Sequence, residues 1–126
     1  MENSNVQLTS TEWSVMECFW EASPRTAMQV VNYLSSSKGW AKSTSMTMLA
    51  RMEKKGLITA QITGRRKLYT GNVKREEAVR QETNSFLEKV YHGSVGMMIN
   101  AMVETNDLSD EDIDELYDVL NKLKEK

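Results

Sequence analysis

Two short runs of alternating apolar and polar residues, 57–63 and 66–70, interrupt a chain whose pattern is otherwise helical. In the first run, every second residue from Ile58 to Ile62 is apolar, as a strand with one buried face requires. A two-residue connection that begins with Gly64 separates the runs, and such a connection is typical of a β-hairpin. The sequence therefore predicts one short hairpin in a mainly helical protein.

Three helical segments precede this hairpin. Capping boxes, in which a threonine precedes a Glu or Gln by three residues, open the first two at Thr9 and Thr26. We expect helices over 11–20, from Thr26 until the second one dissolves within 35–39, and over 42–55. Gly56 follows the third helix and favours a left-handed cap, and the cations Lys54 and Lys55 in its last turn suit the negative end of the helix dipole. Three helices followed by a hairpin is the order of elements in the winged helix-turn-helix.

The remainder of the chain is also helical in pattern. Apolar periodicity predicts helices over 74–92 and 95–104, and a last one that Ser109 caps. The residue chemistry changes where the first of these begins, so we place a boundary between residues 1–75 and 76–126. The predicted fold is mainly α with a small β-hairpin wing: a winged helix-turn-helix domain followed by a helical C-terminal domain.

Charge is segregated between these two parts. The formal net charge is −2, but residues 1–75 carry eleven Lys and Arg against five Asp and Glu, whereas 76–126 carry five against thirteen. Such segregation indicates a basic face for a polyanion and a separate acidic segment. A solvated acidic tail on a neutral domain is the alternative, although the basic residues also cluster locally.

One face of the predicted third helix combines cations with short hydroxyl side chains. Short hydroxyls let a helix approach base edges and phosphates, and Arg and Lys add contacts to guanine and phosphate. Hydroxyls also cap helices, but capping does not need the four of Ser43, Thr44, Ser45 and Thr47. We expect the opposite face to be buried and to hold Met48, Leu49 and Met52, with Met46 beside them. The candidate DNA-contacting residues of this helix are Lys42, Ser43, Thr44, Thr47 and Arg51.

The hairpin turn is the second basic element, with three successive cations, Arg65, Arg66 and Lys67. Neighbouring cations gain little from one another, whereas cations facing phosphates or a minor groove gain by counterion release. A solvated turn is the alternative. Because both basic elements belong to one motif, the sequence predicts double-stranded DNA as the partner.

Residue types that carry catalysis or bind metals are scarce. The single cysteine, Cys18, excludes an internal disulfide framework and a cysteine-cluster metal site, and its apolar helical context predicts a buried, inert thiol. We interpret the only histidine, His92, as a helix-terminal residue. The acidic stretch 107–115 resembles a calcium loop but lacks the glycine that the turn of such a loop needs. We therefore expect no enzyme, no catalytic residue, no metal site and no cofactor.

The hydropathy pattern also excludes a membrane protein. No run approaches the ~18 apolar residues of a membrane span, and the N-terminal residues lack the basic-then-apolar pattern of a signal peptide. We therefore expect a cytoplasmic protein that does not associate with membranes.

The C-terminal helices carry more apolar residues than a small monomer is expected to expose. The segment 95–104 is too apolar to face water, and the leucine stripe of the last helix needs a partner. A helix-mediated homodimer buries both and places two basic heads on one duplex, whereas packing onto the winged domain is the alternative. The candidate dimerisation residues are Phe86, Val90, Met98, Ile99, Met102, Val103, Ile113, Leu116 and Leu120.

Several segments resemble a known family. LTSTEWSVM, WAKSTSMTMLARMEKKG and GRRKLYT, at 8–16, 40–56 and 64–70, are similar to the winged-helix part of the penicillinase repressor family (BlaI/MecI), which includes copper-responsive CopY-type repressors. Residues 85–87, 91–93 and 108–116 resemble its dimerisation helices. The resemblance implies a homodimeric repressor that binds pseudo-palindromic operators with TACA/TGTA-type half-sites and controls genes of resistance or metal homeostasis. The helix and turn residues named above match the reading helix and wing of the family, but Ala41 stands where it usually has a serine cap.

The family has two modes of release from DNA, and this sequence departs from both. In the antibiotic-resistance branch, proteolysis at an Asn–Phe bond inactivates the repressor; the matching bond here is Asn100–Ala101. Copper-responsive members end in a Cys-x-Cys pair motif, whereas this sequence ends in LKEK. The upstream sensor or protease is therefore unknown. The alternative function is a winged-helix protein-interaction module that does not bind DNA.

Overall fold

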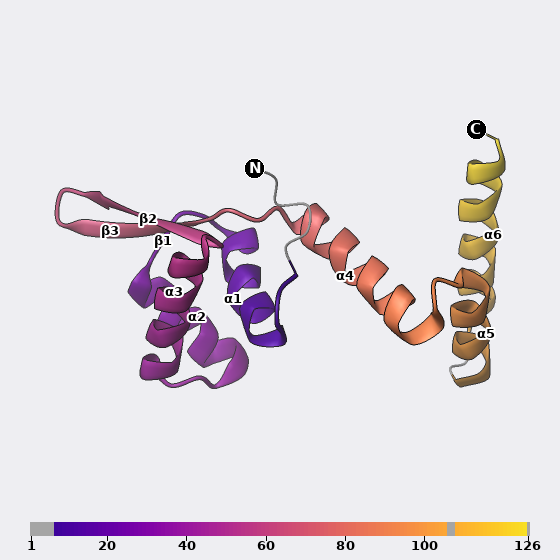
Figure 1. Cartoon of the computed structure of the whole chain (residues 1–126), viewed down its shortest axis with the longest axis horizontal. Coiled ribbons are helices and arrows are strands. Elements are labelled where there is room, and N and C mark those ends of the chain that lie inside the picture. Colours follow the sequence, from indigo (N-terminus) through magenta and orange to yellow (C-terminus); the bar gives the residue numbers. More distant parts are fainter. Residues whose placement is uncertain (1–6, 106–107, 126) are drawn as a thin grey trace. The chain divides into compact units, whose positions relative to one another are not determined.

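A computed structural model describes residues 7–105 and 108–125 of the chain (Figure 1). The described residues divide into two units, one up to Thr83 and one from Asn84 onward. The elements, in order, are α1 (Ser10–Glu21), β1 (Arg25–Thr26), α2 (Ala27–Lys38), α3 (Lys42–Lys55), β2 (Ile58–Thr63), β3 (Arg66–Gly71), α4 (Arg75–Tyr91), α5 (Val95–Thr105) and α6 (Asp110–Lys124). The winged helix-turn-helix is thus confirmed in the first unit: three helices, then a hairpin.

The boundary between the units lies inside α4 rather than at its start. Val73 and Ala78 are buried in the core of the first unit, and the indole Nε1 of Trp20 donates a hydrogen bond to the carbonyl of Val73 (2.8 Å). These contacts attach the connection before α4, and the first turns of α4, to the winged unit.

Both predicted capping boxes are present. Thr9 and Glu12 cap α1 reciprocally, and Thr26 and Gln29 do the same for α2. The helix α2 ends within the predicted stretch 35–39, but it stays helical through the serines to Lys38 instead of dissolving there.

Local hydrogen bonding explains this extension of α2. The Ser37 hydroxyl donates to the carbonyl of Tyr33 (2.8 Å), which satisfies the serine within the helix. The helix ends only at Gly39, whose φ of 71° is the left-handed conformation that glycine adopts readily.

The hairpin has the predicted turn. Thr63 lies opposite Arg66 in the β2–β3 ladder, so the connection has two residues, and Gly64 has a φ of 65°. A positive φ at the first of two turn residues matches the right-handed twist of the flanking strands. On its other side β3 pairs with β1, which places Arg25 opposite Tyr69. The sequence did not predict this two-residue strand.

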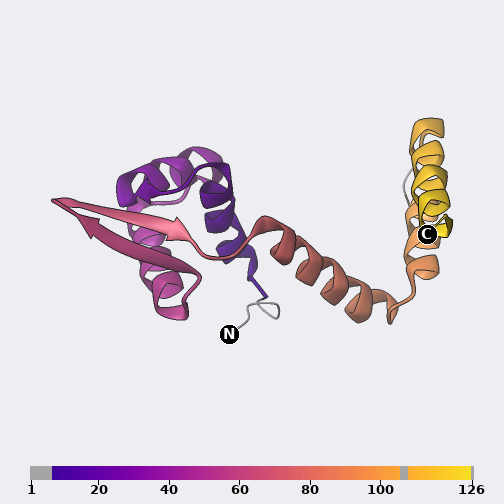
Figure 2. The same cartoon turned by 90° about the horizontal axis from the view of Figure 1, so that it is seen from above.

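Only the base of the hairpin is buried. Ile58 is 1% exposed, whereas Ile62, which was predicted to face the same core, is 77% exposed. The reason is visible in Figures 1 and 2, where the hairpin extends beyond the three helices of its unit. The core lies instead between α1, α2, α3 and the hairpin base. Its largest fully buried side chains are Met16, Leu34, Leu49, Met52, Ile58, Val15, Val30, Cys18 and Ser45.

The core contains the single cysteine and one face of α3, both of which the sequence predicted to be buried. Cys18 is completely buried, as predicted, and burial raises the pKa of its thiol to about 11, which disfavours the reactive thiolate. The predicted buried stripe of α3 is partly wrong. Leu49 and Met52 are buried, but Ser45 takes the third position, Met48 is half-buried and Met46 is exposed. Residues at 45, 49 and 52 are four and three apart, which keeps them on one helix face.

The second unit holds the end of α4 together with α5 and α6. The helix α4 ends at Tyr91, and His92 and Gly93 follow with φ values of 52° and 85°, so His92 is the helix-terminal residue that was predicted. Ser109 caps α6 and forms a capping box with Asp112. In both views α5 and α6 lie side by side (Figures 1 and 2), and neither has a buried residue.

Candidate DNA-binding surface

The outer face of α3 presents the predicted reading residues to solvent. Lys42, Ser43, Thr44, Thr47 and Arg51 are all exposed, while Leu49 and Met52 hold the opposite face in the core. A shallow hollow of about 240 Å³ lies on this face, lined by Ser43, Thr44, Thr47, Met48 and Arg51. We call it the α3 hollow. It combines hydroxyl groups and one guanidinium, the groups that approach base edges in a major groove.

The N-terminus of α3 has no side-chain cap. Ala41 is the N-cap residue, and no side-chain oxygen accepts a hydrogen bond from the first turn. The positive end of the helix dipole and the uncapped N–H groups therefore face solvent beside Lys42. Such an arrangement favours an anion.

An ion pair between an exposed lysine and a buried carboxylate fixes the other end of α3 against α1. The Lys55 Nζ lies 2.5 Å from a carboxylate oxygen of Glu12, whose side chain is 6% exposed. The other oxygen of Glu12 accepts the backbone N–H of Thr9 (2.9 Å). Burial raises the pKa of Glu12, but the hydrogen bonds from Lys55 and Thr9 outweigh it, so the pKa lies below its ordinary value of 4.5. Glu12 therefore stays ionised and holds the last turn of α3.

The three wing cations are exposed, but one of them has contacts within the wing. The Lys67 Nζ lies 5.3 Å from the ring centre of Tyr69, and a side-chain hydrogen bond with Tyr69, aided by the charge of Glu53, raises the pKa of Lys67. Arg65 and Arg66 have no ion-pair partner among the described residues. All three cations therefore present charge to solvent, but only Lys67 also lies against a ring of the wing.

The reading helix and the wing are joined by one side chain that sequence reasoning missed. The Asn72 Nδ2 donates to the carbonyl of Gly56 (3.1 Å) and to the Thr59 hydroxyl (2.6 Å). It therefore bridges the C-cap of α3 and the base of β2. No local sequence signal marks this role, because the bridge connects residues that come together only when β3 returns beside β2.

All eight predicted DNA-contacting residues thus lie in one unit and reach solvent, on α3 and on the hairpin turn. Sequence reasoning missed a further cation. Lys54 was interpreted only as a charge that suits the helix dipole, yet it is seven residues after Thr47 and three after Arg51. With about 3.6 residues per turn, that spacing places all three on one helix face, a signal that was present in the sequence.

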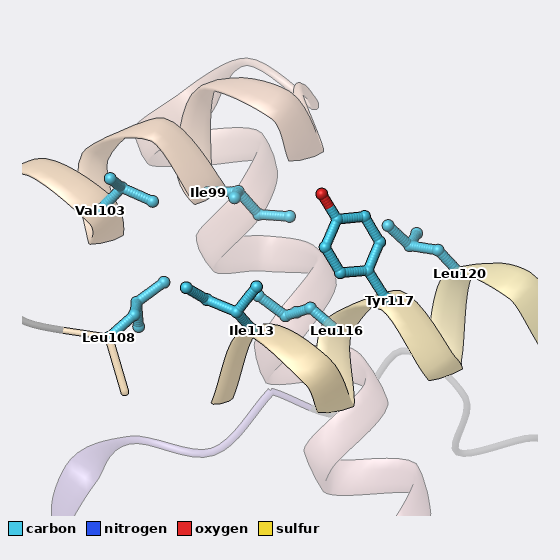
Figure 3. A pocket seen from close by; sticks show the side chains of 7 residues that line it. All are labelled: Ile99, Val103, Leu108, Ile113, Leu116, Tyr117 and Leu120. Atoms are coloured by element: carbon cyan, nitrogen blue, oxygen red, sulfur yellow. The ribbon is translucent and has the colours of Figure 1, made fainter. Parts of the chain in front are cut away.

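The predicted dimerisation residues present an apolar surface in the second unit. Val103 is 57% exposed and Leu120 is 48% exposed. An apolar groove of about 700 Å³ lies between α5 and α6, and Figure 3 shows its side chains pointing toward one another across it. We call it the α5–α6 groove; its lining is Ile99, Val103, Leu108, Ile113, Leu116, Tyr117 and Leu120. Phe86 and Val90, on α4, are also exposed.

The structure also locates the bond that matches the family's cleavage position and the residue types that could bind a metal. The Asn100–Ala101 bond, which matches the cleavage position of the family but lacks its phenylalanine, lies within α5. In the described part of the chain, no three His, Cys, Asp or Glu side chains gather where they could hold a metal ion. Part of the acidic stretch, residue 107, lies outside the described residues. None of the helices at 7–105 and 108–125 is both long and apolar enough to cross a membrane.

The fold and this surface define a winged-helix protein of the DNA-binding type, and comparison with known proteins gives its family. The family model for the penicillinase repressor matches residues 8–122. The penicillinase repressor of Bacillus licheniformis is 32% identical over 95% of this chain and 94% of its own. The methicillin resistance regulatory protein MecI of Staphylococcus aureus (strain N315) is 30% identical over 97% of this chain and 99% of its own. The chain belongs to the penicillinase repressor family, whose members are DNA-binding transcriptional repressors rather than enzymes.

Solved structures agree with this assignment. The solution structure of the monomeric form of Bacillus licheniformis BlaI in complex with the blaP half-operator has a TM-score of 0.52 and 32% identity, covering 58% of this chain and 89% of that one. The DNA-binding domain of the repressor BlaI has a TM-score of 0.50 and 31% identity, covering 56% of this chain and 85% of its own.

Proposed function

We propose that this protein is a homodimeric transcriptional repressor that acts in the cytoplasm by occupying a pseudo-palindromic operator with TACA/TGTA-type half-sites. Its target genes would be of the resistance or metal-homeostasis type. One observation carries the proposal: α3 exposes a face of hydroxyls and cations, and a basic wing lies in the same unit. The opposite face of α3 is fixed in the core, and hydrogen bonds of Asn72 join the helix to the base of the wing. The similar BlaI structure, which is described in complex with a half-operator, supports DNA as the partner.

The roles of the residues follow from their chemistry. Thr44, Thr47 and Arg51, in the α3 hollow, read base edges in the major groove. Lys42 contacts a phosphate beside the uncapped helix N-terminus. The wing cations Arg65, Arg66 and Lys67 contact phosphates or the minor groove, and their binding releases counterions.

The second unit supplies the dimer in this proposal. Its helices α5 and α6 have no buried residue in the single chain, and the α5–α6 groove is lined almost entirely by aliphatic side chains. Exposed apolar surface of this kind marks an interaction site. A second copy would cover it and bring two winged heads onto successive half-sites. In this proposal residues 1–75 supply the DNA-binding domain and 76–126 the dimerisation helices, although the first turns of α4 pack on the winged core.

A salt titration tests DNA binding. Fluorescence anisotropy would follow the protein on a duplex with TACA/TGTA half-sites and on a random duplex of equal length. We expect affinity to fall steeply as salt rises, because each neutralised phosphate releases counterions. No binding to either duplex at low salt would instead favour a protein-interaction module.

Two variants test the assigned roles in the same assay. Arg51→Ala should cost about 1–3 kcal/mol on the cognate duplex and relax its preference over the random one. Arg66→Ala should weaken binding to both duplexes alike and lower the salt slope by about one unit. Equal losses on both duplexes for both variants would contradict this division of roles.

A further inference from the structure

A second groove adjoins the reading face and has no role in the function proposed above. It has a volume of about 380 Å³ and lies where the N-terminus of α1 meets the C-terminal half of α3; its lining is Thr9, Thr11, Glu12, Met48, Arg51, Lys54 and Lys55. We call it the α1–α3 groove. Met48 and Arg51 also line the α3 hollow. The two depressions therefore adjoin each other along α3.

The α1–α3 groove has an excess of positive charge. Its lining contains three cations and one carboxylate, and that carboxylate, on Glu12, is already paired with Lys55. Arg51 and Lys54 are exposed, and neither has an ion-pair partner within residues 7–105 and 108–125. An anion that enters the groove would therefore meet two cations whose charge nothing in the described chain neutralises.

The groove also offers a hydroxyl donor. The Thr9 Oγ1 accepts the backbone N–H of Glu12 (3.1 Å) and lies 3.2 Å from the Thr11 Oγ1. When the Thr9 hydroxyl donates to the Thr11 oxygen, the Thr11 hydroxyl keeps its own hydrogen for a ligand in the groove. A hydroxyl beside an unpaired ammonium is a common pair of phosphate ligands in protein–DNA interfaces.

We propose that the α1–α3 groove binds a backbone phosphate of the same duplex that α3 reads. The Lys54 ammonium and the Thr11 hydroxyl donate to the phosphate oxygens, and the Glu12–Lys55 pair holds the two walls of the groove together. This inference rests on the proposed function. It extends the DNA contacts from α3 and the wing to the N-terminus of α1, and it makes Lys54 a contact residue rather than a charge that only stabilises its helix.

Affinity measurements on two single variants and their double variant test the proposal. Lys54→Gln and Thr11→Val should each weaken binding to the half-site duplex and to the random duplex alike, by roughly three- to tenfold for the lysine and less for the threonine. Lys54→Gln should lower the slope of log K against log salt by about 0.9, because one phosphate is no longer neutralised. Since both side chains serve one phosphate, the double variant should lose less than the product of the two single losses.

Matched variants separate a contact from a general effect of charge. Lys38→Gln removes an exposed cation from the last turn of α2, outside both depressions on α3, and should change affinity by less than twofold. Lys54→Arg should keep the salt slope. Equal effects of Lys54→Gln and Lys38→Gln, or multiplicative losses in the double variant, would overturn the proposal.

The same experiment shows which claim fails. If the wild-type chain binds neither duplex, the proposed function itself is wrong. If the wild-type chain binds and Arg66→Ala weakens it as expected, but Lys54→Gln and Thr11→Val change nothing, only the phosphate site is refuted. Thermal unfolding of each variant confirms that the fold is retained, so that a loss of affinity reports on the contact.

Discussion

The ion pair between Glu12 and Lys55 gives the sharpest prediction about stability. Replacing Lys55 with Met keeps the aliphatic stem of the side chain and removes its charge. The Glu12 carboxylate, 6% exposed, is then left with the hydrogen bond from the Thr9 N–H and no cation. We expect the last turn of α3 to loosen from α1, because this pair joins them.

The magnitude follows from the exposure of the two partners. A hydrogen bond to a charged group contributes about 1.5–3 kcal/mol. The Lys55 side chain is 55% exposed, so solvent screens part of the interaction and the lower half of that range applies. We expect Lys55→Met to lower the free energy of unfolding by about 1.5–2 kcal/mol at neutral pH, which is roughly a 10- to 30-fold change in the unfolding constant.

The loss should depend on pH in a defined direction. The pKa of Glu12 is lowered in the folded protein from its ordinary 4.5, so its ionised form stabilises the fold above the unfolded-state pKa. That stabilisation is lost as the pH falls through the folded-state pKa. The difference in stability between wild type and Lys55→Met should therefore be constant from neutral pH to about pH 5 and should shrink below the ordinary pKa.

Urea unfolding followed by tryptophan fluorescence, at one protein concentration, measures this difference. Glu12→Gln in the Lys55→Met background is the control, because a neutral side chain of the same shape removes the unpaired charge and should recover part of the loss. The reasoning would be refuted by a Lys55→Met effect below 0.5 kcal/mol, or by one that stays the same down to about pH 3.

Three other variants test single features of the structure. Asn72→Ala removes both hydrogen bonds that join α3 to β2 and should cost about 1–2 kcal/mol in unfolding free energy; unchanged amide exchange in the hairpin would contradict its bridging role. Gly71→Ala would place a Cβ 3.1 Å from the Cβ of Phe19 and should cost about 1–3 kcal/mol by overpacking, measured by thermal unfolding. Leu116→Glu, in the α5–α6 groove, should shift the protein toward monomer in sedimentation velocity, whereas Val119→Glu, outside the groove lining, should do so less.

Much of the fold could be predicted because its signals are local. A capping box needs only two residues three apart, and those at Thr9 and Thr26 are present as predicted. The bounds of α3 follow from Gly56, which has a φ of 84° and closes the helix. The two-residue hairpin turn at Gly64 is equally local. In each case neighbouring residues decide the conformation, so the sequence alone carries the information.

The features that escaped prediction depend on residues distant in the chain. The strand β1 exists because it pairs with β3, about forty residues later. The burial of Ser45 in place of Met48 follows from the face that α3 turns toward the core, which hydrophobicity alone does not fix. The boundary inside α4 arises because Ala78 packs into the winged core.

The candidate DNA-binding surface likewise has a part that the sequence predicts and a part that depends on distant residues. Its cations and hydroxyls were predictable from composition and order, since α3 and the hairpin turn were correctly located. The groove beside Lys54 was not, because it forms only where α1 and α3 meet.

The hairpin tip has a consequence for engineering. Burial stops at Ala60 and Tyr69, and the residues between Gln61 and Lys67 contribute nothing to the core. The length of the wing can therefore change without changing the stability of the core. Adding two residues to each strand keeps every side chain on its own face and would move the basic turn outward by about 7 Å. The spacing between wing and reading helix is thus open to redesign without any change in the interior.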